Sequence, residues 1–297
     1  MLPFLQSTFS AVDEHIKDGR FGRSLAFVTS TSSLISGLEV AYEHYKGSYS
    51  NPVMYSPVLL SGALTAAGVS AVFSRRAAET ILRWTSTITL LDGVIGFGFH
   101  VRGIARKPGG WRIPITNLIM GPPIFAPLLF GTAAYLGLMA SYLRREDDPK
   151  MSLTGSYLRR GWKRDLYEGR FQRHLSGVAA LWTALSGLEA WYSHYKSRFK
   201  IWSQWTPVIL APVQFGICIG AIFSETVAQK ALPASSGLAL LNGTVGFGYH
   251  VRGVMRRPGG RKKWLYNILY GPPVFAPLLF AACGALGLVA SLLRREK

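Results

Sequence analysis

Four histidines stand at two repeated positions of the chain, and their imidazoles are the side chains best suited to hold a metal or a haem. His44 and His194 each lie five residues after a glutamate in a Ser-Gly-Leu-Glu segment. His100 and His250 each end a segment of the form Gly-x-x-Gly-Phe-Gly-aromatic-His. Imidazole nitrogen is a common ligand of zinc and iron, including haem iron. The pattern predicts a cofactor site wherever the fold brings two of these rings together.

The chain carries these positions twice because it is a tandem duplication. The stretch Gly93–Gly103 recurs as Gly243–Gly253, and the two copies are 150 residues apart without a gap. Between Leu90 and Glu146, about three positions in five match their partners, which is too strong for a coincidence of composition. We therefore expect two structural repeats, residues 1–147 and residues 148–297.

The composition indicates a membrane protein. Hydrophobic residues make up 49% of the 297 positions and charged residues 16%, yet the formal net charge is +18. The charges lie in clusters between long apolar stretches, as basic loops do between transmembrane helices. A lipid bilayer is thus the expected partner and nucleic acid is not. Cys218 and Cys283 stand in apolar runs outside the repeated pattern, so we expect neither a disulfide nor a cysteine metal site.

Four apolar segments in each half are long enough to cross a bilayer as helices. They are residues 24–45, 54–74, 84–104, 115–143, 174–195, 204–224, 234–254 and 265–293. The sequence therefore predicts an all-α integral membrane protein with eight transmembrane helices, arranged as two parallel four-helix bundles. In plan alone, this arrangement resembles four-helix membrane cytochromes b, and no motif matches a named family.

An even number of spans in each half places both termini and the central linker on one side of the membrane. That side has more Lys and Arg, so we expect it to be cytoplasmic, in a cell inner or plasma membrane. Amphipathic segments at residues 2–17 and 153–166 precede the two bundles. We expect both to lie in the membrane interface.

Helix direction places the two histidines of each half at similar depth on two parallel helices. This arrangement predicts a bis-histidine haem b site in each half. Gly96 and Gly246 share a helical stripe with His100 and His250, and removal of their side chains would leave a slot for a flat cofactor. In this hypothesis, two arginines near the same membrane surface would pair with the haem propionates. These arginines are Arg102 and Arg252.

The same residues are also compatible with three other functions: a non-haem metal site, a proton-coupled transporter and a structural membrane subunit. Glu39 with His44 and His100, or Glu189 with His194 and His250, would provide the ligands for a non-haem iron or zinc site. The two glutamates would also serve a proton-coupled transporter. A structural membrane subunit without a cofactor would use the same glycines for close helix packing. No hydrolytic or transferase constellation is present, so enzymatic activity would have to be redox chemistry with a protein partner in a membrane complex.

Overall fold

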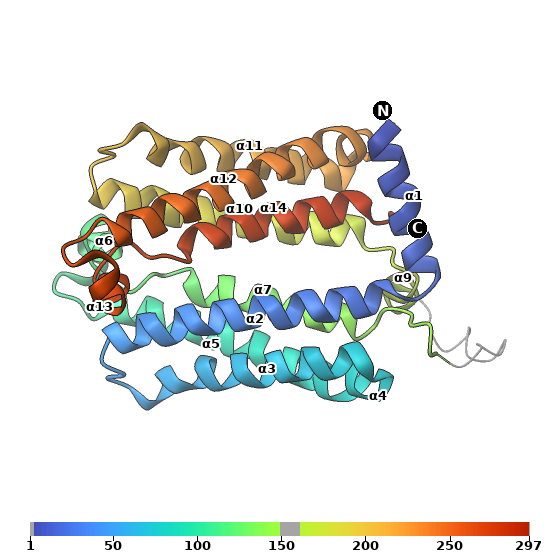
Figure 1. Cartoon of the computed structure of the whole chain (residues 1–297), viewed down its shortest axis with the longest axis horizontal. Coiled ribbons are helices and arrows are strands. Elements are labelled where there is room, and N and C mark those ends of the chain that lie inside the picture. The colour runs from blue at the N-terminus through green and yellow to red at the C-terminus, as the bar shows by residue number, and fades with distance from the viewer. Residues whose placement is uncertain (1–2, 149–160, 297) are drawn as a thin grey trace. The chain divides into compact units, whose positions relative to one another are not determined.

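The computed structural model describes residues 3–148 and 161–296, and within these ranges the chain is helical with no strands (Figure 1). A lone bridge between Arg170 and Arg294 is the extended pairing recorded there. The long helices of the first half are α1 (Pro3–Lys17), α2 (Phe21–Lys46), α3 (Ser56–Phe73), α5 (Arg83–Ala105) and α7 (Ala126–Ala140). Those of the second half are α10 (Gln172–Lys196), α11 (Trp205–Phe223), α12 (Leu232–Met255) and α14 (Ala276–Leu292).

Short helical elements connect the long ones. In the first half these are η1 (Pro52–Tyr55), α4 (Arg75–Ala77), η2 (Ala78–Leu82), η3 (Gly110–Arg112) and α6 (Pro114–Ile119). In the second half they are α9 (Trp162–Tyr167), η4 (Trp202–Gln204), η5 (Val227–Ala231), η6 (Gly260–Lys263) and α13 (Trp264–Leu269). Both η2 and η5 are single π-helical turns.

The chain forms two compact units. The first unit comprises residues 1–98, 126–172 and 292–297, and in it α2 packs between α3 and α7. The second unit comprises residues 99–125 and 173–291, and in it α11 packs on α12. Each unit has its own buried side chains, for example Leu64 in the first and Leu232 in the second.

The sequence repeat is visible in the element boundaries. α6 and α13 begin and end 150 residues apart, and α3, α5 and the π-turn match their counterparts within one residue or two. Shared prolines and glycines follow the ends of α5 and α6 and of their counterparts, namely Pro108 and Gly121 in the first half and Pro258 and Gly271 in the second. The assignment of residues 1–147 and 148–297 to two structural repeats stays a prediction.

Three helical stretches are long and apolar enough to cross a membrane: Pro52–Phe73, Arg75–Ala105 and Trp202–Phe223. They agree with the expected spans at 54–74, 84–104 and 204–224. Two shorter apolar helices are α7 and α14. The structure is thus that of an all-helical protein with the character of a membrane protein, and the full set of eight spans stays a prediction.

The fourth expected span of each half is wrong as a single helix. The segment 115–143 divides into α6 and α7, and 265–293 divides into α13 and α14. The break follows Met120 and contains the Gly-Pro-Pro sequence that starts at Gly121. Proline has no N–H to donate and its ring clashes with the preceding turn, so two adjacent prolines interrupt the helix.

The two expected interfacial segments are only partly described. Residues 3–17 form α1, as predicted, whereas Met1 and Leu2 lie outside the described residues, and the side chains of residues 1–9 are not described either. Most of the segment 153–166 falls in residues 149–160, which are also outside the description. Its last part is helical and belongs to α9.

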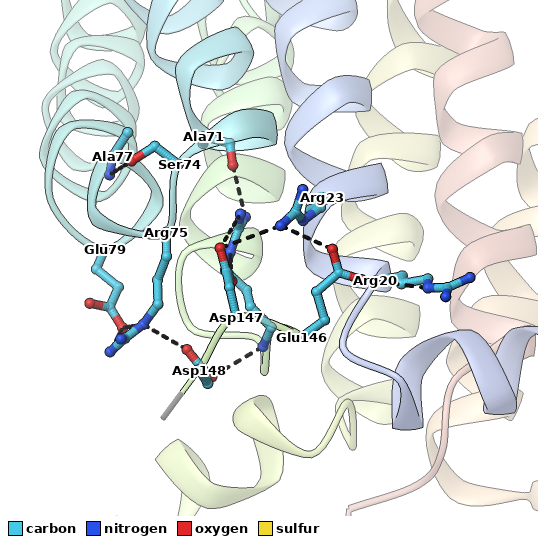
Figure 2. A network of polar contacts seen from close by, with 11 residues as sticks. Arg20, Arg23, Ala71, Ser74, Arg75, Ala77, Glu79, Glu146, Asp147 and Asp148 are labelled. Carbon is cyan, nitrogen blue, oxygen red and sulfur yellow. Dashed lines mark hydrogen bonds and ion pairs between the residues drawn. The ribbon is translucent and has the colours of Figure 1, made fainter. Parts of the chain in front are cut away.

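A network of charged side chains closes one end of the first unit (Figure 2). The guanidinium of Arg145 is buried, and its Nη1 donates to the carbonyl of Ala71 at 2.7 Å. Its Nε contacts the carboxylate of Asp147 at 3.0 Å. Ala71 lies in the last turn of α3, where carbonyls lack helical partners, so Arg145 caps this helix. Arg75 reaches the next carboxylate, Asp148, at 2.8 Å.

The pKa of Asp147 lies below its ordinary value as a result. Burial raises this pKa, but the hydrogen bond and positive charge of Arg145, a backbone hydrogen bond and the charge of Arg23 together lower it by more. The carboxylate therefore stays ionised and balances the buried guanidinium. Asp147 also pairs with Arg23 at 3.4 Å, so this carboxylate links Arg145 to the start of α2.

Candidate histidine site

The break before the last apolar helix provides a hydrogen-bond acceptor for the histidine of α5 and of α12. Pro123 and Pro273 lie in the non-helical segments that precede α7 and α14. Their carbonyls therefore take no part in a helical hydrogen-bond ladder. The carbonyl of Pro123 accepts from His100 Nδ1 at 2.7 Å.

The second half repeats this bond, and His44 of α2 makes a bond of the same kind. His250 Nδ1 lies 2.5 Å from the Pro273 carbonyl, and His44 Nδ1 lies 2.6 Å from the Met54 carbonyl. A carbonyl can only accept, so Nδ1 must carry the proton in each case. In the neutral ring, Nε2 is then the unprotonated nitrogen. This is the arrangement in which a histidine binds a metal through Nε2 while a carbonyl fixes its orientation.

The second unit brings two of the four predicted histidines together. The ring centroids of His194, on α10, and His250, on α12, are 6.5 Å apart, and the ring planes cross at 82°. The matching residues of the first half belong to different units, because His44 lies in the first and His100 in the second. The structure thus brings His194 and His250 together, and the cofactor sites expected in the two halves stay predictions.

An unusual turn places an aromatic ring beside the histidine of the first helix in each half. Ser48 and Tyr49 have φ values of 58° and 44°, and Arg198 and Phe199 have 57° and 47°. Such left-handed conformations cost about 1–2 kcal/mol for a residue with a side chain. The Tyr49 ring meets the His44 ring edge-on at 6.1 Å, and the Phe199 ring lies 6.3 Å from that of His194.

A second aromatic side chain holds each of these rings in place. Tyr49 stacks on Tyr55 at 4.2 Å between centroids, and Phe199 stacks on Trp205 at 3.9 Å. The Tyr49 hydroxyl also donates to the Ala41 carbonyl at 3.0 Å. The strained turn therefore fixes one aromatic ring, Tyr49 or Phe199, next to the imidazole of each half.

The glycines of the histidine stripe face the start of the last apolar helix. A Cβ added at Gly96 would lie 3.1 Å from Pro127 Cβ, and one at Gly246 would lie 3.1 Å from Pro277 Cβ. At Gly243, an added Cβ would come within 2.4 Å of the backbone nitrogen of Ala281. These glycines allow the two helices to approach closely, which is the usual role of small residues in membrane helices.

The arginines and glutamates of the predicted sites lie on other helix faces than the histidines. Arg102 and Arg252 are exposed, and each lies two residues after its histidine, about 200° around the helix. Glu39 and Glu189 are half-buried, one turn before the tyrosines at positions 42 and 192. Across residues 3–148 and 161–296, no three His, Cys, Asp or Glu side chains converge as a metal-ligand group. The Glu–His–His set is thus not assembled there.

The proline carbonyls and the aromatic side chains beside the histidines were not predicted from the sequence. A signal for the carbonyls was available in the Gly-Pro-Pro sequence, which both halves share and which interrupts the helix at the accepting proline. A signal for the aromatic side chains was the matched pairs Tyr49/Phe199 and Tyr55/Trp205. The left-handed turn had no signal, because neither turn places glycine at the strained positions.

No known protein family, curated protein or solved structure matches this chain. The class of protein is therefore defined by the fold and composition, as an all-helical protein with helices of membrane-spanning length. Its function has to be inferred from the histidine geometry.

Proposed function

We propose that the protein is an integral membrane haem b subunit, with eight transmembrane helices and one bis-histidine site in each half. In this proposal the subunit transfers electrons to a protein partner or anchors that partner at an inner or plasma membrane. The termini and the central linker are cytoplasmic. The single observation that carries the proposal is the ring pair His194–His250.

The separation of these rings fits coordination of one metal between them. A metal–imidazole bond is about 2.0–2.1 Å long, so two nitrogens on opposite sides of an ion are about 4 Å apart. With about 1.2 Å from each nitrogen to its ring centre, the centroids would be about 6.5 Å apart. The observed distance is 6.5 Å. The bond from His250 Nδ1 to a carbonyl supports the same assignment, since it presents Nε2 as the ligand.

Haem would need only two protein ligands, because the porphyrin supplies four nitrogens of its own, and His194 and His250 would hold it and allow one-electron redox chemistry. The angle between the ring planes does not oppose this, since each imidazole would bind through one nitrogen. The first half has the same residues, and there both His44 and His100 donate Nδ1–H to a carbonyl, as His250 does in the second half. We extend the proposal to that pair by sequence equivalence.

A second candidate is a non-haem iron or zinc ion bound by the same histidines. The observation that favours it is the packing of Gly96 and Gly246 against prolines, because close helix packing accounts for the glycines without a flat cofactor. In this alternative, water molecules or a partner's side chains would complete the coordination, with Glu39 and Glu189 as neighbouring carboxylates.

An absorption spectrum combined with metal analysis of the purified full-length protein separates these candidates. Haem predicts a Soret band and α-bands that sharpen on reduction, and a non-haem ion predicts stoichiometric metal without a Soret band. H194A and H250A should each remove the second-half centre, and the exposed His174 provides the control variant H174A. Protein expressed with ample haem and metal that contains neither would overturn the proposal.

A further inference from the structure

Two loops of the second unit have a fixed backbone built around one asparagine each. The loops are residues 106–121 and 256–271, which follow α5 and α12 and include the short helices α6 and α13. Asn117 Nδ2 donates to the carbonyls of Pro108 and Gly110 at 3.1 and 2.7 Å. Asn267 makes the two equivalent bonds at 3.3 and 3.2 Å. Both asparagines are buried, so each loop folds around its amide.

Glycine is required where these loops reverse direction. Gly109 and Gly110 have φ values of 79° and 47°, and Gly259 and Gly260 have 85° and 45°. Two successive left-handed residues turn the chain sharply and direct the following 3-10 turn back toward the short helix. Both loops therefore have a well-defined backbone. Figure 1 shows α6 and α13 at the same end of the second unit's helices.

The two loops carry arginine and lysine side chains and have no acidic neighbours in the sequence. No Asp or Glu occurs from Gly93 to Arg145 or from Gly243 to Arg295. The exposed basic residues of the two loops are Arg106, Arg112, Arg256, Arg261, Lys262 and Lys263. Such a cluster attracts an anionic partner, and its guanidinium groups match the geometry of a phosphate group.

Large apolar side chains are exposed in the same short segments. Trp111, Ile115 and Met120 are 48%, 62% and 67% exposed, and Trp264, Tyr266 and Tyr270 are 55%, 56% and 60% exposed. Aromatic and aliphatic side chains interleaved with cations are typical of protein segments at the lipid headgroup level. A soluble acidic partner would account for the cations alone, whereas a membrane surface accounts for both kinds of side chain.

We infer that these two loops form a binding surface for anionic phospholipids, in which arginine and lysine contact the phosphates and the exposed aromatic residues enter the acyl boundary. This inference rests on the membrane placement in the proposed function and does not depend on haem. The second loop should bind more strongly, because Arg261, Lys262 and Lys263 stand where the first loop has Trp111, Arg112 and Ile113.

The test is native mass spectrometry of the full-length protein in detergent, titrated with phosphatidylglycerol or phosphatidylcholine. Each cation near an anionic lipid surface contributes about fivefold in affinity at low salt. R261Q/K262Q/K263Q should therefore lower the affinity for phosphatidylglycerol by about tenfold to 100-fold. The matched control R76Q/K200Q/K230Q removes the same number of exposed positive charges from other elements and should retain binding.

Other occupants are distinguished in the same experiment. Equal binding of the two lipids, or equal losses in the test and control variants, would overturn the inference. Competition by inorganic phosphate at the lipid's concentration would indicate a free-phosphate site, and binding of polyglutamate without a preference for phosphatidylglycerol would indicate an acidic protein. Either result would overturn it. The Soret band and metal content are read separately, so a failed haem proposal leaves this test intact.

Discussion

The last apolar helix of each half is followed by the same Leu-Arg-Arg-Glu sequence, yet the two halves use it differently. In the first half, Asp147 and Asp148 follow, and Arg145 is buried against Asp147 and the end of α3. In the second half, the matching Arg295 is only half-buried and donates to the neutral side chain of Gln172 at 2.7 Å. A repeated motif thus acquires its electrostatic role from the residues around it.

The largest effect should come from this difference. Arg145→Met removes a buried guanidinium, leaves the Ala71 carbonyl without this donor and leaves Asp147 with Arg23 as its remaining arginine partner, which should lower the free energy of unfolding by about 2–4 kcal/mol. Arg295→Met removes a hydrogen bond from a partly exposed group and should cost about 1–2 kcal/mol. Denaturant unfolding of both variants in one detergent checks this order. Equal losses would show that burial of Arg145 does not distinguish the halves.

The interiors of the two halves also differ. Leu64 of the first half corresponds to Gln214 of the second, and both are almost fully buried. Gln214 Nε2 donates to Ser236 Oγ at 2.8 Å, while its Oε1 has no hydrogen-bond partner within the part of the chain described. A buried amide with an unmatched acceptor is unfavourable, whereas a leucine at the same depth is not.

Exchanging these two residues should change the free energy of unfolding differently in the two halves. Leu64→Gln should lower the free energy of unfolding by about 1–3 kcal/mol, because it buries an amide in an apolar site. Gln214→Leu should leave it unchanged or raise it, since the orphan acceptor disappears. Thermal unfolding of both single variants gives the comparison. A clear loss of stability in Gln214→Leu would mean that the amide has a partner essential to the second half.

Close packing at glycine can be tested within the second half alone. Gly243→Ala places a Cβ against the backbone of α14, which cannot move without shifting the helix, so the variant should lose about 1–3 kcal/mol. Gly248 has no heavy atom within 4 Å of an added Cβ, and Gly248→Ala should be neutral or stabilising. Unfolding in one detergent measures both. Equal stability of the two variants would contradict the packing role of Gly243.

Much of the fold was accessible from the sequence because its signals are local. Long apolar runs and the repeat predicted α3, α5 and α11 within a few residues. The same reasoning failed at residues 115–143, where length and apolarity favoured one helix. There the Gly-Pro-Pro sequence at 121–123 determines the backbone, because a proline without an N–H overrides a favourable hydropathy pattern.

The candidate site was predictable in part. Spacing identified His194 and His250 as a pair because their helices run in the same direction and place them at similar depth. It did not identify Pro273 as the acceptor for His250, since that bond depends on a break between α13 and α14 that hydropathy does not show. The role of Gly246 was also ambiguous, because a missing side chain is equally consistent with a slot and with a close helix contact.

The smallest effect concerns the end of the second half, where Arg294 pairs with Asp13 of α1. The equivalent arginine of the first half, Arg144, is exposed, and the residue at the position equivalent to Asp13 is Lys163. The hydrogen bond from Arg294 lowers the pKa of Asp13 below its ordinary value of 3.8, although burial opposes this shift. The pair therefore contributes stability above pH 3.8 that is lost as the pH falls through the lowered pKa.

Because the Asp13 carboxylate is about one-third exposed, this contribution should be below about 1 kcal/mol. Asp13→Asn should accordingly lower the free energy of unfolding slightly at pH 6 and have a smaller effect near pH 3. Asp18→Asn, at an exposed position near the same helix end, is the control. The measurement is the difference between variant and wild type across this pH range, which cancels the titration of Asp147 and Glu168. A difference that stays constant with pH would show that Arg294 does not favour the ionised form of Asp13.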